Sequence, residues 1–176
     1  YLKNNNFYDN SKLDSGMKYV SSLINTVNTR FNYQLYTDKN MDFSYKYKII
    51  SKLVIYDKKD KHRIFYTKEE ELVPEVTENF NSNNIVINQL ADIKYDYYNG
   101  YVESYKKDYN ADVEGKVVVT MNVELLGIDS ESKNNLTKTN DLQITIPLTK
   151  EAIDITIDSE NINNKDYLVS DMKSGI

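Results

Sequence analysis

Few residues in this 176-residue chain have the types and the spacing that catalysis or metal binding usually requires. The one histidine, His62, stands between Lys61 and Arg63 in a charged stretch, which favours a solvated turn. A Ser-His-Asp triad needs a histidine that other side chains can surround, and zinc sites use mostly histidine and cysteine. The chain has no cysteine, so disulfides and thiolate chemistry are excluded as well.

Carboxylates are numerous, and some are spaced so that they could hold a cation or share a proton. Asp92 and Asp96 are four residues apart, which would place both on one face of a helix. The stretch that begins with Asp129 and Glu131 offers oxygen ligands but lacks the spacing of an EF-hand. Neither group belongs to a recognisable motif, so we interpret both as ordinary solvated surface.

A third acidic group is a stretch that would collect cations only weakly, and we interpret it as surface too. It contains Glu69, Glu70 and Glu71, followed by Glu75 and Glu78. The sequence therefore predicts no catalytic residue, no metal site and no cofactor, and it leaves the ligand-binding residues unassigned.

The sixteen tyrosines are the remaining side chains that could recognise a ligand, and the chain has no tryptophan. Sugar-binding surfaces use exposed aromatic rings, and Tyr95, Tyr98 and Tyr109 could contribute to such a surface. Other tyrosines fall on the apolar stripe of a predicted helix, where a structural role is expected: Tyr97, Tyr101 and Tyr105.

The composition is that of a globular protein, with 40% hydrophobic and 28% charged residues. The net charge of -5 argues against nucleic acid as a partner, because nucleic-acid binding usually needs a basic face. Five glycines without a Gly-rich phosphate loop disfavour a nucleotide enzyme. Among 22 basic residues only Arg30 and Arg63 are arginine, a bias that an AT-rich bacterial genome would encode.

Alternation of apolar and polar residues predicts several antiparallel strands. In the clearest run, from Met41 to Ile55, every second residue is apolar or aromatic with the single exception of Ser51. A turn at residues 38–40 precedes this run, a charged turn at residues 57–61 follows it, and Ile64 begins the returning strand. Further alternating runs cover residues 117–125, 142–148 and 153–157.

Between residues 88 and 109 the period changes to that of an amphipathic helix. Asn88 could cap its start, and Gly100 in its middle costs about 1 kcal/mol relative to alanine. The predicted apolar stripe has spacings of 3, 4, 4, 4 and 4 and consists of Leu90, Ile93, Tyr97, Tyr101, Tyr105 and Tyr109.

These elements predict a mainly β fold, an antiparallel Ig-like β-sandwich with one inserted long helix at about residues 88–109. The alternative is an α+β fold in which one curved antiparallel sheet packs on that helix. We expect a polar N-terminal arm at residues 1–15, a single β-rich domain at 16–158, and a polar C-terminal tail or linker at 159–176.

The order of several segments resembles a family of uncharacterised bacterial and archaeal membrane-anchored proteins, often encoded near signal-peptidase-type genes. The segments are FNYQL at residues 31–35, LVIY at 53–56, LVPE at 72–75, the helix at 88–109 and ITIPL at 144–148. The resemblance covers about Phe31 to Ile157. It implies an extracytoplasmic domain between two transmembrane helices that lie outside these 176 residues, and it carries over no functional residue.

The sequence thus favours a non-enzymatic extracytoplasmic domain of a membrane-anchored protein, acting in cell-surface assembly or protein recognition. Its expected partner is a protein at the cell surface and not nucleic acid. The alternative is a ligand-sensing or glycan-binding surface module, which requires a concave pocket with aromatic walls. A hydrolase that uses paired carboxylates is the least favoured function.

Overall fold

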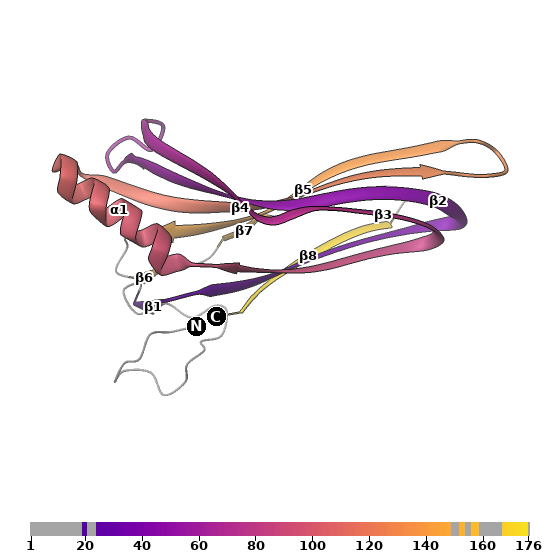
Figure 1. Ribbon diagram of the computed structural model, residues 1–176, viewed down its shortest axis with the longest axis horizontal. Coiled ribbons are helices and arrows are strands. Elements are labelled where there is room, and N and C mark those ends of the chain that lie inside the picture. Colours follow the sequence, from indigo (N-terminus) through magenta and orange to yellow (C-terminus); the bar gives the residue numbers. More distant parts are fainter. Residues whose placement is uncertain (1–18, 21–23, 149–151, 154–155, 159–166, 176) are drawn as a thin grey trace.

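The protein is mainly β, as the sequence predicts, with one helix in the part that the structure describes (Figure 1). A computed structural model describes residues 19–20, 24–148, 152–153, 156–158 and 167–175. In chain order the elements are β1 (Tyr19–Val20), β2 (Val27–Asp57), β3 (Ile64–Ile93), α1 (Tyr95–Tyr109), β4 (Val113–Ile128), β5 (Asn135–Leu148), β6 (Ala152–Ile153), β7 (Thr156–Asp158) and β8 (Tyr167–Gly175).

The main sheet is organised around β2, which pairs antiparallel with β3, β4 and β8. Beyond β4 the sheet continues through β5 to β7, while β1 and β6 form a separate two-stranded pair. The described strand β8 lies within residues 159–176, where composition predicts a polar tail, and it pairs with the first half of β2. The predicted arm at residues 1–15 lies outside the described residues.

The predicted turn at residues 38–40 is wrong, because the chain continues through it as one strand. Tyr36 pairs with Asn84 and Met41 with Ser82, so four residues of β2 bulge out opposite a single residue of β3. Both strands keep each other as partners on either side of this bulge, and their long hairpin turns back on itself (Figure 1). The two segments flanking the bulge are therefore halves of one strand and not neighbours in a meander.

The folded hairpin brings together residues that are far apart along it. The Tyr47 hydroxyl donates a hydrogen bond to the Gln89 side chain at 3.1 Å. Gln89 is paired with Phe31 in the other half of the hairpin, so the two halves must face each other. The Tyr33 hydroxyl likewise donates a hydrogen bond to the Asn140 side chain of β5 at 3.4 Å. Side chains from both halves of the hairpin belong to one core cluster. Burial of these apolar faces is the main stabilising contribution.

The alternating pattern predicted for residues 41–55 is confirmed, since its apolar parity faces the core. We call the face of β2 that carries Ser51, Leu53 and Ile55 the inner face, and all three side chains are buried there. Their β3 partners on the same face are Glu70, Lys68 and Tyr66. β3 is the edge strand, because β2 is its one partner among the described strands.

The predicted helix exists, but its start at Asn88 is wrong. Residues 88–93 belong to β3, which stays paired with β2 as far as Ile93, and α1 begins at Tyr95. The predicted apolar stripe is also wrong. The buried helix residues are Tyr95, Tyr98 and Val102, spaced 3 and 4 apart. Strand pairing thus overrides the helical period over residues 88–93 and changes which tyrosines face the core.

Helix α1 is held against β4 by a close approach at Gly115. A Cβ atom added there would overlap Val102 Cγ2 and lie 3.4 Å from Leu148 Cδ1. Glycine is thus required for the distance between α1 and the sheet, and this distance sets the position of every side chain on the opposite face of the helix.

We predict that Gly115→Ala lowers the free energy of unfolding by about 1–3 kcal/mol, because the added methyl group overpacks the contact with Val102. Adding Val102→Ala to this variant should restore part of the loss by making room for the new methyl. Chemical denaturation of the two single variants and the double variant would measure the coupling. Additive effects of the two substitutions would contradict the contact.

Candidate functional site

An open groove of about 520 Å³ lies between α1 and the sheet. We call it the tyrosine groove, because four tyrosines of α1 and one of β3 form most of its wall. It is lined by Ile55, Tyr66, Tyr97, Gly100, Tyr101, Ser104, Tyr105, Asp108 and Tyr109. Aromatic walls with a few polar groups are typical of ligand sites.

A bulge in β3 gives the groove its sheet-side wall. Ile64 pairs with Tyr56 and Tyr66 pairs with Ile55, which leaves Phe65 as the extra residue on β3. Bulges re-aim side chains, and here two successive aromatic residues both meet the helix. The Phe65 ring stacks on Tyr105 with centroids 6.2 Å apart, and the Tyr66 ring stacks on Tyr101 at 6.5 Å.

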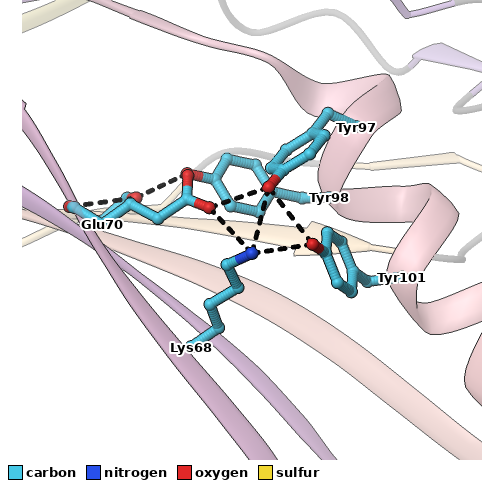
Figure 2. Close-up of polar contacts among 6 residues, drawn as sticks. Lys68, Glu70, Tyr97, Tyr98 and Tyr101 are labelled. Atoms are coloured by element: carbon cyan, nitrogen blue, oxygen red, sulfur yellow. Dashed lines mark hydrogen bonds and ion pairs between the residues drawn. The ribbon is translucent and has the colours of Figure 1, made fainter.

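A polar network at one end of the groove ties α1 to the edge strand (Figure 2). Its cation is Lys68, whose ammonium group donates to the hydroxyls of Tyr101 at 2.7 Å and Tyr97 at 3.2 Å. The same nitrogen lies 3.3 Å from Glu70 Oε1 and 4.6 Å from the centroid of the Tyr101 ring. The three ammonium protons thus each have an acceptor inside the protein.

Glu70 is the anion of this network, and each of its carboxylate oxygens accepts from a helix tyrosine (Figure 2). The Tyr97 hydroxyl donates to Oε1 at 2.8 Å, and the Tyr98 hydroxyl donates to Oε2 at 3.0 Å. Ser51 Oγ lies 2.5 Å from the Tyr98 oxygen and donates to it, because the Tyr98 proton is given to Glu70. The network is therefore satisfied internally and fixes the rings at the groove entrance.

The pKa values in the network follow from these contacts. Burial by itself raises the pKa of Glu70, but hydrogen bonds from Tyr97, Tyr98 and Lys68 outweigh it, and the net pKa is lowered. Burial raises the pKa of Tyr98 to about 12. The bond to Tyr101 raises the pKa of Lys68, and the same bond lowers that of Tyr101. At neutral pH the network thus contains one ammonium, one carboxylate and neutral phenols.

A second hollow of about 330 Å³ adjoins the groove on the other side of Tyr97. Asp92, Lys94 and Glu70 contribute charged groups to its wall, together with Leu72 and Tyr98. Since Tyr97 lines both hollows and is 42% exposed, its ring forms the boundary between them. A ligand longer than one hollow could therefore extend past Tyr97 along the helix.

Gly100 forms part of the groove's floor on the helix side. A Cβ atom built there would meet no atom within 4 Å, so packing inside the described protein does not require glycine. Glycine in a helix interior nevertheless costs about 1 kcal/mol relative to alanine. Glycine at position 100 therefore lowers helix stability without improving internal packing. It also leaves the groove open, as a ligand site there would require.

The other residues singled out in the sequence do not converge on a site. His62 lies in the exposed turn between β2 and β3, where its backbone N–H donates to Asp60. Asp92 and Asp96 do not share a helix face, because Asp92 belongs to β3. Asp129 accepts hydrogen bonds from Glu131 and Ser132 within the turn between β4 and β5.

The interpretation of the acidic stretch as plain surface missed Glu70. The interpretation of the tyrosines was correct for Tyr101 and Tyr105, which pack against the core, and wrong for others. Tyr95 and Tyr98, predicted as exposed, are buried, whereas Tyr109 is 70% exposed. Tyr97 lies in the groove and not in the core. One signal was visible in the sequence. Ser51 is the single polar residue among the alternating apolar positions of residues 41–55, and its hydroxyl forms a hydrogen bond with Tyr98.

The described residues contain no group of three histidine, cysteine, aspartate or glutamate side chains arranged to hold a metal ion. Among the same residues no helix is long and apolar enough to cross a membrane. Comparison with known proteins found no matching family model, curated protein or solved structure. The functional argument therefore rests on the geometry of the tyrosine groove.

We predict that Glu70→Gln destabilises the protein in a pH-dependent way. Because the folded-state pKa of Glu70 is lowered, its charge stabilises the fold above the unfolded-state value of about 4.3, and this contribution is lost as pH falls through the folded-state pKa. The difference in unfolding free energy between wild type and variant should thus narrow in acid. Glu103→Gln, at an exposed position of α1, is the control. A gap for Glu70→Gln that stays constant from neutral pH into acid would refute the role of this charge.

Proposed function

We propose that this domain is a non-enzymatic recognition module that binds a partner protein in the tyrosine groove. The observation that carries the proposal is the groove itself: tyrosines of α1 and β3 wall a hollow of about 520 Å³ over a glycine floor. Tyrosine supplies a large contact area at low cost in conformational entropy, and it is enriched at protein interfaces. The internally satisfied network of Lys68 and Glu70 supports binding over catalysis, since its charged groups are already engaged.

The proposal includes the location that the family resemblance implies. The domain acts in surface assembly or protein recognition outside the cytoplasm, held by membrane segments that flank these residues. Support comes from the resemblance at residues 31–157 and from the acidic net charge, which disfavours nucleic acid.

The proposal also includes the finer fold class, an antiparallel β-sandwich in which one folded hairpin supplies strands to both layers. The hydrogen bond between Tyr47 and Gln89 and that between Tyr33 and Asn140 support it. The three buried side chains of α1 support a helix that completes the second layer at one end of the sheet. Such a helix accounts for the wall of the groove without a further domain.

A glycan-binding module is the second candidate, and the aromatic groove favours it as well. Sugars stack on free ring faces, but several faces here are already covered. Tyr66 and Tyr101 stack on each other, and Lys68 lies over the Tyr101 ring. This occupancy is the reason for placing protein recognition first.

The groove's role is tested by filling it. Gly100→Gln adds a side chain to open space in the groove and should leave the fold intact, whereas Glu103→Gln adds the same residue outside the groove. We expect a photo-reactive amino acid at Ser104 of the full-length protein to crosslink a partner on intact cells. The adduct should disappear with Gly100→Gln and persist with Glu103→Gln. An adduct that is insensitive to Gly100→Gln, or no adduct at all, would refute binding in the groove.

The location is tested separately by adding protease to intact cells that make the full-length protein, followed by membrane fractionation. We expect cleavage of the domain from outside and retention of the remnants in the membrane fraction. A domain that is protected from protease and released into the soluble fraction would contradict both the anchor and the extracytoplasmic location.

A further inference from the structure

We infer that the tyrosine groove receives a lysine or arginine side chain from an extended basic segment of the partner, and that this segment pairs with the free edge of β3. The inference rests on the proposed recognition function and specifies its ligand.

Lys68 shows how this surface binds an ammonium group. Two tyrosines one helical turn apart, Tyr97 and Tyr101, offer their hydroxyls and the face of one ring, and a carboxylate balances the charge. Cations bind tyrosine faces because the ring quadrupole is negative there. The arrangement of two aromatic rings and one carboxylate is therefore a cation site, occupied in this case by the protein itself.

The next turns of α1 repeat the two rings and the carboxylate, and the internal cation beside them, Arg63, lies over Phe65, which stacks on Tyr105, and not over Tyr105 or Tyr109. Tyr105 and Tyr109 are again four residues apart, with ring centroids 4.7 Å apart, and Asp108 lines the groove beside them. Within the described residues Asp108 has no ion pair, and Tyr109 is 70% exposed. This aromatic and carboxylate group lacks only the cation, and a basic side chain entering the groove would supply it.

The edge of β3 indicates that the cation is carried on an extended peptide. Among the described strands β2 is the one partner of β3, so no described strand pairs with the other side of β3, where a further strand could be added. Alternate side chains of a strand added there would point toward the inner face, where Tyr66 lines the groove and Lys68 belongs to the polar network at the end of it.

The charge of this edge selects the partner. Within residues 64–71 Glu70 is paired with Lys68, and the exposed Glu69 and Glu71 leave a net charge of -2 that attracts a basic strand. A second copy of the chain is disfavoured, since two β3 edges that carry the same net negative charge repel each other. Pro74 and two bulges near it also limit pairing beyond Glu71, so the expected contact lies along residues 64–71.

The test measures binding of fluorescein-labelled heptapeptides by anisotropy. One probe alternates lysine with threonine, and its match alternates glutamate with threonine. We expect the wild-type domain to bind the lysine peptide and not the glutamate peptide. Asp108→Asn should weaken binding about tenfold, and Gly100→Gln should abolish it. Glu103→Gln, which also removes one negative charge from α1, should leave binding unchanged.

Two further results would overturn the inference. Equal weakening by Asp108→Asn and Glu103→Gln would mean that net charge alone attracts the peptide. Undiminished binding of a lysine peptide in which every backbone amide is N-methylated would exclude strand pairing, because such a peptide has no backbone N–H to donate to the β3 edge.

The outcomes also separate this inference from the proposed function. If the lysine peptide fails to bind but a cello-oligosaccharide binds and is lost with Gly100→Gln, the groove is a glycan site. If the lysine peptide fails and crosslinking from Ser104 still gives an adduct sensitive to Gly100→Gln, recognition stands and the basic peptide is wrong. If neither probe binds and no adduct forms, both proposals fail.

Discussion

The pairing of β2 and β3 along nearly their whole lengths is the constraint on which the rest of the structure depends. The two strands have 31 and 30 residues, far longer than the usual five or six. A flat hairpin of that length could not bury both ends of its apolar face. The bulge between Tyr36 and Met41 solves this problem, because it lets the hairpin turn back and close over its own core. β4 and β8 pair directly with β2, and β5 and β7 extend the sheet beyond β4.

The tyrosine groove is a consequence of the same pairing. Because β3 remains a strand until Ile93, α1 cannot begin before Tyr95, and its buried side becomes that of Tyr98 and Val102. The predicted tyrosine row is then only partly buried, at the margin of the core and against the edge strand. The hydroxyls of Tyr97 and Tyr101 are satisfied there by Lys68 and Glu70, since polar groups at a partly buried interface need partners. The helix start thus determines both the core and the groove.

Much of the strand content could be predicted from sequence, because alternation reports directly on which face is buried. The run from Met41 to Ile55 and the runs around residues 117–125 and 142–148 were found this way and occur as strands. The fold-back at residues 37–40 could not be found. A turn and a large bulge have the same local composition, and only the partner strand distinguishes them. The family resemblance stays a prediction, as do the anchor and the location.

The helix shows why the site itself escaped prediction. One turn of an α-helix takes 3.6 residues, so residues spaced four apart shift gradually around the helix. From sequence alone, a row such as Tyr97, Tyr101 and Tyr105 is therefore equally consistent with a core stripe and with a groove wall. Gly100 distinguishes the two. A mid-helix glycine under a packed interface would have a neighbour close to its missing Cβ, as Gly115 has in Val102, whereas Gly100 faces open space. No packing contact in the described residues requires glycine at position 100, so its cost of about 1 kcal/mol to helix stability is offset only by the several hydrogen bonds that together hold α1 to β3. The polar network holds α1 to β3 at one end of the groove, and the rest of the groove is open.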